Sequence, residues 1–405
     1  MELLSPGGSL EKLKYAIIYG ADAVYASGKK FGLRSKSTNL TYQELKEAVT
    51  FCHHHQKKIY ITVNIFPHNK HINEFRTFLQ FLQDIQADGL IISDPGVFTL
   101  AREITPKLPI HISTQANVTS WKSAEFWYKL GARRIILARE LSYEEIKTIR
   151  NKIPELELEI FIHGAMCMAY SGRCLLSMFL NKRNANLGNC SQPCRWKYSL
   201  LEETRPGEFF TLEEDENGSY ILNSKDLCLI NKLQKIIELG INSVKIEGRM
   251  KSIYYSANLT RTYRTAISYL KNKESVPDSI LKEVHRVSHR HYTEGFFSEG
   301  EKEIQHYSSS SYIRNYQFIG LVKANKDNWI DLEVKSGFSR DDQLELIYPD
   351  FHNDYNFRVS EIRDEENQPI NKAKPNSVVK LLLQKKTHSY GIVRKKIQGN
   401  DHETL

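Results

Sequence analysis

Residues 58–93 read KIYITVNIFPHNKHINEFRTFLQFLQDIQADGLIIS. The β-branched and aromatic run Lys58–Ile65 predicts a strand, and the apolar run Gly89–Ser93 predicts a second one. Between them, apolar residues recur every three or four positions over Ile72–Ala87, which indicates an amphipathic helix. A strand, a crossover helix and a second strand of this kind build a parallel sheet.

The same strand-and-helix pattern repeats along the chain. Eight such units within about 270 residues match a (β/α)8 TIM-like barrel better than an open doubly wound sheet, which remains the alternative. The predicted strands are Glu2–Leu4, Ala23–Ala26, Lys58–Ile65, Gly89–Ser93, Ile110–Gln115, Arg134–Ala138, Glu157–His163 and Ser243–Glu247. The predicted helices are Ser9–Tyr19, Tyr42–His55, Ile72–Ala87, Val97–Leu108, Ser120–Leu130, Tyr143–Ile153, Lys225–Leu239 and Ser256–Leu270.

Beyond residue 310 the periodicity changes from helical to alternating. Six short segments, from Gln317–Val322 to Tyr390–Val393 and including Phe357–Ile362, predict a small all-β barrel. We therefore expect a catalytic barrel over 1–275 with a cysteine-rich insertion at about 164–222, a linker over 276–310 and a β-barrel domain over 311–405. No apolar run of about 18 residues and no secretory signal is present, so we expect a cytoplasmic protein.

Four of the six cysteines are clustered. Cys167, Cys174, Cys190 and Cys194 have the spacing C-x6-C-x15-C-x3-C. Four thiolates in one loop can hold a [4Fe–4S] cluster or a zinc ion. Paired C-x2-C knuckles, which zinc sites favour, are absent, so we favour iron–sulfur. Cys228 competes with Cys194 for the fourth position, whereas Cys52 lies mid-helix and is expected in the core.

Polar residues follow the predicted strands where a barrel carries its chemistry. Lys245, Glu247 and Arg249 share one face of the eighth strand and are candidate catalytic residues, with His163 at the end of the seventh. The same reasoning selects residues at the ends of strands three to six, although each could simply bond to a neighbouring loop: Asn64, Asp94, Gln115 and Arg139.

Net charge is +8, and the basic residues are unevenly distributed. Residues 249–273 hold six basic side chains and no acidic one, with four tyrosines interleaved. Such a stretch could contact RNA phosphates and bases, or be a solvated face. The candidate RNA-binding residues here and in the insertion are Lys251, Arg261, Arg264, Lys182 and Arg183. No Walker A, G-x-G-x-x-G, G-x-S-x-G or H-E-x-x-H motif occurs, which disfavours NTPases, Rossmann enzymes, serine hydrolases and zinc proteases.

Longer motifs resemble a known family. They are ELLSP (2–6), VNIFPHN (63–69), SDPG (93–96), LARELS (137–142), CMAYSGRCLLS (167–177), CRW (194–196), NSKDL (223–227) and KIEGR (245–249). Together they resemble the collagenase-like peptidase family of unassigned catalytic type, and within it the branch of prephenate-dependent tRNA uridine hydroxylases.

The resemblance implies an enzyme that converts the wobble uridine of tRNA to 5-hydroxyuridine with a [4Fe–4S] cluster and prephenate. It maps the cluster ligands to Cys167, Cys174, Cys190 and Cys194; Cys228 matches a ligand position of other relatives. Prephenate is a dicarboxylate, and we expect it near Arg249, Arg34 and Arg139, with Asp94 also in the cofactor region. The alternatives are a peptidase and a non-catalytic tRNA-binding protein. Neither a membrane nor DNA is an expected partner.

Overall fold

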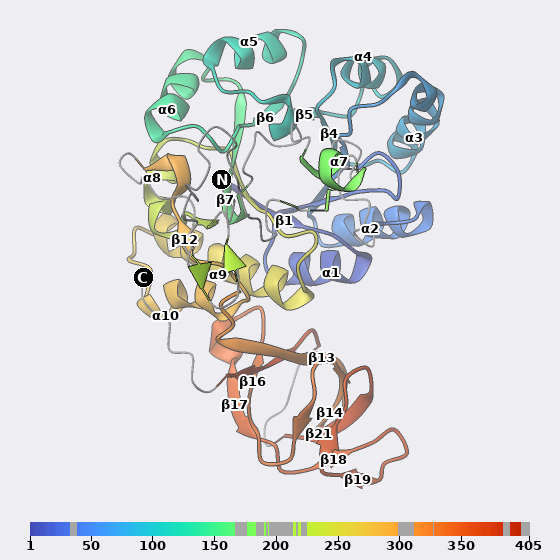
Figure 1. Cartoon of the computed structure of the whole chain (residues 1–405), viewed down its shortest axis with the longest axis vertical. Helices are drawn as coiled ribbons and strands as arrows, with labels where there is room; N and C mark the ends of the chain where they lie inside the picture. The colour runs from blue at the N-terminus through green and yellow to red at the C-terminus, as the bar shows by residue number, and fades with distance from the viewer. Residues whose placement is uncertain are drawn as a thin grey trace, which may run out of the picture.

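The computed structural model describes residues 1–32, 39–166, 176–183, 190–191, 193, 214–215, 218–219, 225–298, 312–326, 328–383 and 389–397. They form a barrel ringed by helices and a separate antiparallel β-domain, which hangs below the barrel in Figure 1. Among the described helices, none has the length and apolar character that crossing a bilayer requires.

Eight parallel strands close the barrel. Each strand pairs with the next, and the last, β11, pairs with both β7 and β1, so the sheet has no open edge between them. This closure confirms the (β/α)8 prediction and excludes the open doubly wound sheet. The strands are β1 (Glu2–Pro6), β2 (Ala23–Ala26), β3 (Lys58–Val63), β4 (Gly89–Ile92), β5 (Ile110–Ile112), β6 (Arg134–Ile136), β7 (Glu157–Ala165) and β11 (Ser243–Ile246).

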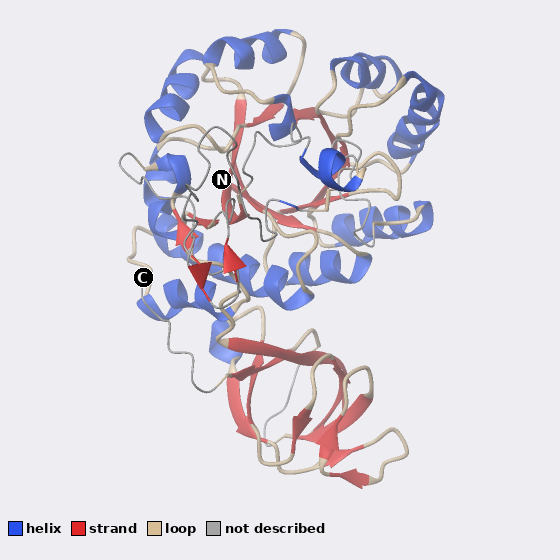
Figure 2. Ribbon diagram, viewed as in Figure 1, coloured by secondary structure: helices blue, strands red, loops and turns tan. Residues whose placement is uncertain are grey.

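Helices surround the barrel in the ring that Figure 2 shows in blue. Local sequence fixes where they begin: Thr41 and Glu44 form a reciprocal capping box, and Ser142 and Glu145 form another. Their bounds are α1 (Leu10–Ile18), α2 (Tyr42–His54), α3 (Ile72–Asp84), α4 (Pro95–Ile104), α5 (Trp121–Lys129), α6 (Tyr143–Lys152), α7 (Leu176–Asn181), α8 (Leu233–Glu238), α9 (Ile253–Lys271) and α10 (Asp278–Leu281).

Strand β7 extends beyond the barrel and carries two added strands. β10 (Asp226–Cys228) pairs antiparallel with the end of β7, and β12 (Tyr292–Thr293) pairs with β10. The helix predicted from Lys225 is therefore wrong in its first turn, because pairing with β7 overrides the local pattern. The predicted linker over 276–310 is also wrong where it is described, since α10, a 3-10 turn (Lys282–Arg286) and β12 pack on the barrel.

The C-terminal region is an antiparallel half-barrel. Its sheet has the order β17-β16-β22-β13-β14-β21-β18-β19, and no pairing joins its two edges among the described residues. The predicted strand Phe357–Ile362 is divided between β17 and β18. The bounds are β13 (Tyr316–Lys326), β14 (Trp329–Val334), β16 (Gln343–Ile347), β17 (Tyr355–Arg358), β18 (Ile362–Arg363), β19 (Pro369–Ile370), β21 (Val378–Leu382) and β22 (Ile392–Lys396). A short pair, β15 (Phe338–Ser339) with β20 (Lys372–Ala373), completes the domain, and β8 (Glu214–Asp215) pairs with β9 (Gly218–Ser219) elsewhere.

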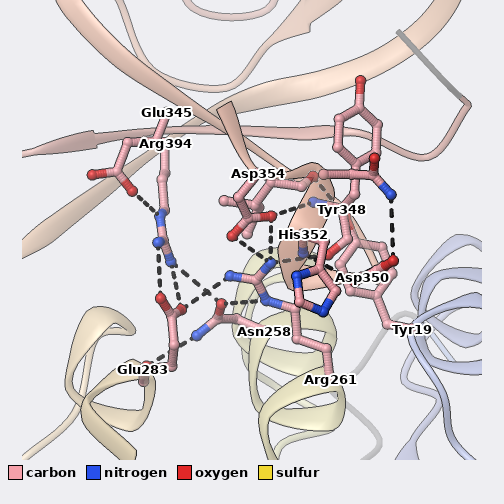
Figure 3. Close-up of polar contacts among 12 residues, drawn as sticks. Tyr19, Asn258, Arg261, Glu283, Glu345, Tyr348, Asp350, His352, Asp354 and Arg394 are labelled. Atoms are coloured by element: carbon pink, nitrogen blue, oxygen red, sulfur yellow. Dashed lines mark hydrogen bonds and ion pairs between the residues drawn. The ribbon is translucent and has the colours of Figure 1, made fainter. Parts of the chain in front are cut away.

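Buried charges join the half-barrel to the barrel (Figure 3). Glu283 accepts hydrogen bonds from Arg261 of α9 at 3.0 Å and from Arg394 of β22 at 2.9 and 3.1 Å. Arg261 also donates to Asp354 of the half-barrel at 2.8 Å. The arginine side chains are at most 1% exposed. The interface is thus a charge-paired junction, and it is not a flexible hinge of exposed residues.

Candidate active site at the barrel mouth

The C-terminal ends of the barrel strands bring cationic groups around one tyrosine. Lys245 Nζ lies 4.3 Å from the ring centroid of Tyr25, and the Arg249 guanidinium lies 5.8 Å from it. Arg249 Nη1 donates to Thr62 Oγ1 at 3.2 Å. Both cations are 4% exposed, so the structure places them inside the barrel, as their alternation with Glu247 on one face predicts.

Tyr25 connects this group to Glu247. Its hydroxyl lies 3.1 Å from Glu247 Oε2 and 3.0 Å from the carbonyl oxygen of Ile246. Burial raises the pKa of Tyr25 well above its usual value, and the nearby Glu247 carboxylate raises it further. The phenol therefore stays protonated and can orient the carboxylate. Sequence reasoning missed Tyr25, although its inward position on β2 was a usable signal.

Beneath these residues a buried ion network fills the barrel. Glu159 accepts from Lys245 Nζ at 3.1 Å and from Arg134 Nη1 at 3.2 Å, and Arg134 in turn contacts Glu2 at 2.6 Å. Burial lowers the pKa of Lys245, while Glu159 opposes that effect. Glu2, Arg134 and Glu159 were also missed. The sequence feature that could have identified them is a charged residue at an inward position of an otherwise apolar strand.

Arg139 is the cation most open to a ligand. Its guanidinium stacks on Phe161 at 3.9 Å from the ring centroid and is half-buried. Within the described part of the chain it has no hydrogen bond or ion pair. A guanidinium held by an aromatic face keeps its donors available for a carboxylate or phosphate.

An uncharged polar cluster occupies the ends of β3, β4 and β5. Gln115 Oε1 accepts from Asn64 Nδ2 at 2.6 Å, from Ser93 Oγ at 3.0 Å and from Ser113 Oγ at 2.9 Å. Asp94 lies beside this cluster in sequence, but its carboxylate caps α4 by accepting from the Val97 amide at 3.0 Å. Asp94 Oδ1 thus has a capping role, and the cofactor contact of Asp94 stays a prediction.

His163 does not face the barrel mouth, so that prediction is wrong. A register shift opposite Lys245 and Ile246 makes a β-bulge in β7, and His163 pairs with the outward-facing Ile246. Its ring contacts Tyr263 of α9 at 3.1 Å and Tyr292 at 3.3 Å. Burial lowers the pKa of His163 well below its usual value, so the ring is neutral.

The bulge is followed by a close approach that only glycine permits. Gly164 has φ +111, and a Cβ there would lie 2.6 Å from the carbonyl oxygen of Glu247. Cys228 lies opposite His163 in β10, and its Sγ is 3.8 Å from the Tyr263 hydroxyl. Burial raises the pKa of Cys228 to about 11. This thiol faces α9 and is protonated.

The other cysteines divide between core and insertion. Cys52 is buried in α2, which confirms its predicted place in the core. Cys190 is half-buried. Cys167, Cys174 and Cys194 lie outside the described residues, as does Arg34. Among the described residues, no group of three or more His, Cys, Asp or Glu could hold a metal ion.

The basic residues in and beside helix α9 differ in their exposure. Arg261 is fully buried in the domain junction, so the prediction is wrong for it. Arg264 donates to the Gly20 carbonyl oxygen at 2.9 Å and pairs with Asp22. Lys251 is half-buried, with Nζ 4.2 Å from the Tyr312 ring centroid. Of the remaining candidates, Lys182 is exposed and Arg183 is half-buried.

We expect Lys182→Glu to weaken RNA binding and flatten its salt dependence. A lost phosphate contact reduces the slope of log affinity against log salt by about one. Electrophoretic or fluorescence titrations of RNA at several salt concentrations measure this slope. Lys107→Glu is the matched control, because exposed Lys107 precedes β5 at the opposite end of the barrel. An equal slope in both variants would remove Lys182 from the interface.

Two family models match the chain, namely Peptidase family U32 over residues 8–307 and Peptidase family U32 C-terminal domain over residues 314–394. The chain is 39% identical to tRNA hydroxylation protein P of Escherichia coli (strain K12) over 91% of each chain. It is 38% identical to tRNA hydroxylation protein P1 of Bacillus subtilis (strain 168), over 97% of this chain and 94% of that protein.

A third relative is named for a modification of ribosomal RNA. The 23S rRNA 5-hydroxycytidine C2501 synthase of Escherichia coli (strain K12) is 32% identical over 86% of this chain and 52% of that protein. The two family models together span the barrel and the half-barrel, and two relatives match nearly the full length. The chain belongs to peptidase family U32.

Proposed function

We propose that this chain is an RNA-hydroxylating enzyme that converts the wobble uridine of tRNA to 5-hydroxyuridine. The observation that carries the proposal is near-full-length similarity to tRNA hydroxylation proteins of two bacteria. A further relative is named for hydroxylation at position 5 of a pyrimidine. A tRNA substrate would place the enzyme in the cytoplasm.

The proposed cofactor is a [4Fe–4S] cluster held by Cys167, Cys174, Cys190 and Cys194. Ser191, next to Cys190, bonds to Ser177 and Asn181 at 2.9 and 2.8 Å, which fixes this part of the insertion against α7. Cys228 is a less favoured candidate for the fourth ligand than Cys194, because its thiol contacts Tyr263. The cluster would supply redox chemistry, while the protein's own residues bind and orient the substrates.

The proposed co-substrate is prephenate. A dicarboxylate suits the barrel mouth because Arg139 and Arg249 offer bidentate donors there, with Lys245 below them. Tyr25 and Glu247 would fix the polar groups around it. We expect Arg139 to bind one carboxylate, since its stacking on Phe161 orients the guanidinium without using its N–H groups.

Nucleoside mass spectrometry of tRNA tests the proposed function. A strain that lacks the gene should lose 5-hydroxyuridine and nucleosides derived from it, and a plasmid copy should restore them. Unchanged tRNA nucleosides in the deletion strain would overturn the proposal.

Cys190→Ala should abolish the iron–sulfur cluster, because the loss of one thiolate opens a coordination position. Iron and sulfide content of protein purified without oxygen measures the effect independently of activity. Cys52→Ala is the control and should keep the cluster, whereas comparing Cys194→Ala with Cys228→Ala identifies the fourth ligand. Full iron and sulfide content in the Cys190 variant would show that the ligand assignment is wrong.

A peptidase function, which the family name suggests, has less support. A cysteine protease needs a histidine that can act as a base toward its thiol. The His163 ring contacts two tyrosines, and burial lowers its pKa well below the usual value, which makes it a weak base. No described cysteine has its thiol paired with this ring. Hydrolysis of gelatin by purified protein would reverse this preference.

A further inference from the structure

The amide cluster at the ends of β3, β4 and β5 has a fixed orientation. Gln115 Oε1 receives three donors, namely Asn64 Nδ2 at 2.6 Å, Ser113 Oγ at 2.9 Å and Ser93 Oγ at 3.0 Å. With Asn64 Nδ2 as a donor, these bonds assign the carbonyl end of the Gln115 amide to the cluster. The Gln115 Nε2 group is therefore directed away from this cluster, and it has no acceptor among the described residues.

Among the described residues, Asn64 has an unpaired acceptor, whereas Gln115 has an unpaired donor. Its Nδ2 is used by Gln115, whereas its Oδ1 is buried and has no hydrogen-bond donor in the part of the chain that the structure describes. Asn64 is only 6% exposed. A buried acceptor without a partner costs stability, and such atoms in native proteins call for a functional reason.

The two residues therefore offer one unused acceptor and one unused donor at the C-terminal end of the barrel, where ligands of this fold bind. We propose that Asn64 and Gln115 recognise the target base through its imide edge. Asn64 Oδ1 accepts from uracil N3–H, and Gln115 Nε2 donates to the adjacent carbonyl oxygen at C4 of uracil. This inference rests on the proposed function and adds to it the residues that choose the base.

The same pair discriminates against cytosine. Cytosine presents a lone pair at N3 and an amino group at C4, so an acceptor would face Asn64 Oδ1 and a donor would face Gln115 Nε2. Rotating the Gln115 amide to suit cytosine would replace its carbonyl oxygen by an NH₂ group against Asn64 Nδ2. Sites built to hydrogen-bond a polar group reject an analogue that leaves those groups unpaired.

Gln115→Glu is the sharpest test, because it keeps an oxygen for the three donors and replaces only the Nε2 donor by an acceptor. The purified, cluster-containing enzyme acts on tRNA with uridine at the target position and on the same tRNA with cytidine there. We expect the rate on uridine to fall about 100-fold, and the ratio of cytidine to uridine product to rise. Gln368→Glu, on the exposed surface of the half-barrel, is the matched control and should leave both rates unchanged.

Asn64→Ala provides a second test that does not depend on tolerance of a new charge. It removes the unpaired buried oxygen and one donor to Gln115 Oε1, which keeps the hydroxyls of Ser93 and Ser113. The protein should therefore fold, while the rate on uridine should fall by a similar factor. Thermal unfolding and iron content separate a folding defect from a recognition defect.

The outcomes distinguish this inference from the proposed function. If wild-type enzyme hydroxylates neither tRNA, the proposed function fails. If wild-type enzyme is active and both variants keep its rate and its preference for uridine, the assignment of Asn64 and Gln115 is overturned. An equal loss on uridine and cytidine in folded variants would also overturn it, because that result indicates a general role in place of base discrimination.

Discussion

Glu283→Ala should destabilise the protein by about 3–5 kcal/mol, the cost of removing one partner from a buried ion network. The Glu283 side chain is 4% exposed and accepts from Arg261, Arg394 and Arg286. Without the carboxylate, the partly exposed Glu345 would be the one ionic partner left to Arg394 among the described residues. Urea unfolding followed by far-UV circular dichroism measures the change in the free energy of unfolding.

Low pH should destabilise the same junction. Burial raises the pKa of Glu283, but Arg261 and Arg394 together lower it well below its usual value of 4.5. A lowered folded-state pKa gives stability that is complete above the unfolded value and is lost as pH falls toward the folded value. The melting temperature of the wild type should therefore decrease below about pH 4.5, and Glu283→Gln should show a flatter profile.

A surface pair provides the control for both measurements. Glu47 bonds to Lys14 at 2.7 Å but its side chain is 48% exposed, so Glu47→Ala should cost less than about 1 kcal/mol. If Glu283→Ala costs no more than Glu47→Ala, the junction does not fix the half-barrel to the barrel. The network would then be incidental to the domain arrangement.

The barrel could be predicted from sequence because its signals are local. Each strand is a short apolar run, and side-chain caps mark the starts of α1, α2, α4, α5, α6 and α9. The bounds of β2, α2 and β11 match the predicted ones within one residue. The inward positions of Lys245 and Arg249 followed from the two-residue repeat of a strand. These features need no knowledge of distant residues.

The residues whose positions are predicted wrongly from the sequence are placed by contacts between distant segments. A bulge in β7 turns His163 from the barrel interior to α9, and nothing in the sequence around His163 specifies which strand position carries the extra residue. The basic neighbours of Arg261 predict a surface cation. Its acidic partners, Glu283 and Asp354, come from other segments and become visible only in the folded chain.

The position of Arg249 is set by its main chain as well as by its side chain. A Cβ at Gly8 would lie 2.1 Å from the Arg249 carbonyl oxygen, and Lys12 Nζ donates to that oxygen at 3.3 Å. The start of α1 therefore fixes the backbone from which the guanidinium reaches Thr62 and Tyr25. A substitution at residue 249 that keeps this backbone should change only the hydrogen-bonding geometry of the cationic group.

Arg249→Lys should keep the fold and the iron content but reduce 5-hydroxyuridine formation by about 100-fold. A lysine retains the charge, yet it has no planar fork to hold a carboxylate in two hydrogen bonds, and small displacements of bound reactants cost rate on this scale. The measurement is hydroxylated tRNA per enzyme, with melting temperature and iron content determined on the same sample. Arg133→Lys is the matched control, since that side chain is 65% exposed and pairs only with Glu157 among the described residues. Activity near wild type would remove Arg249 from the active site, and loss of soluble protein would show that its role is structural.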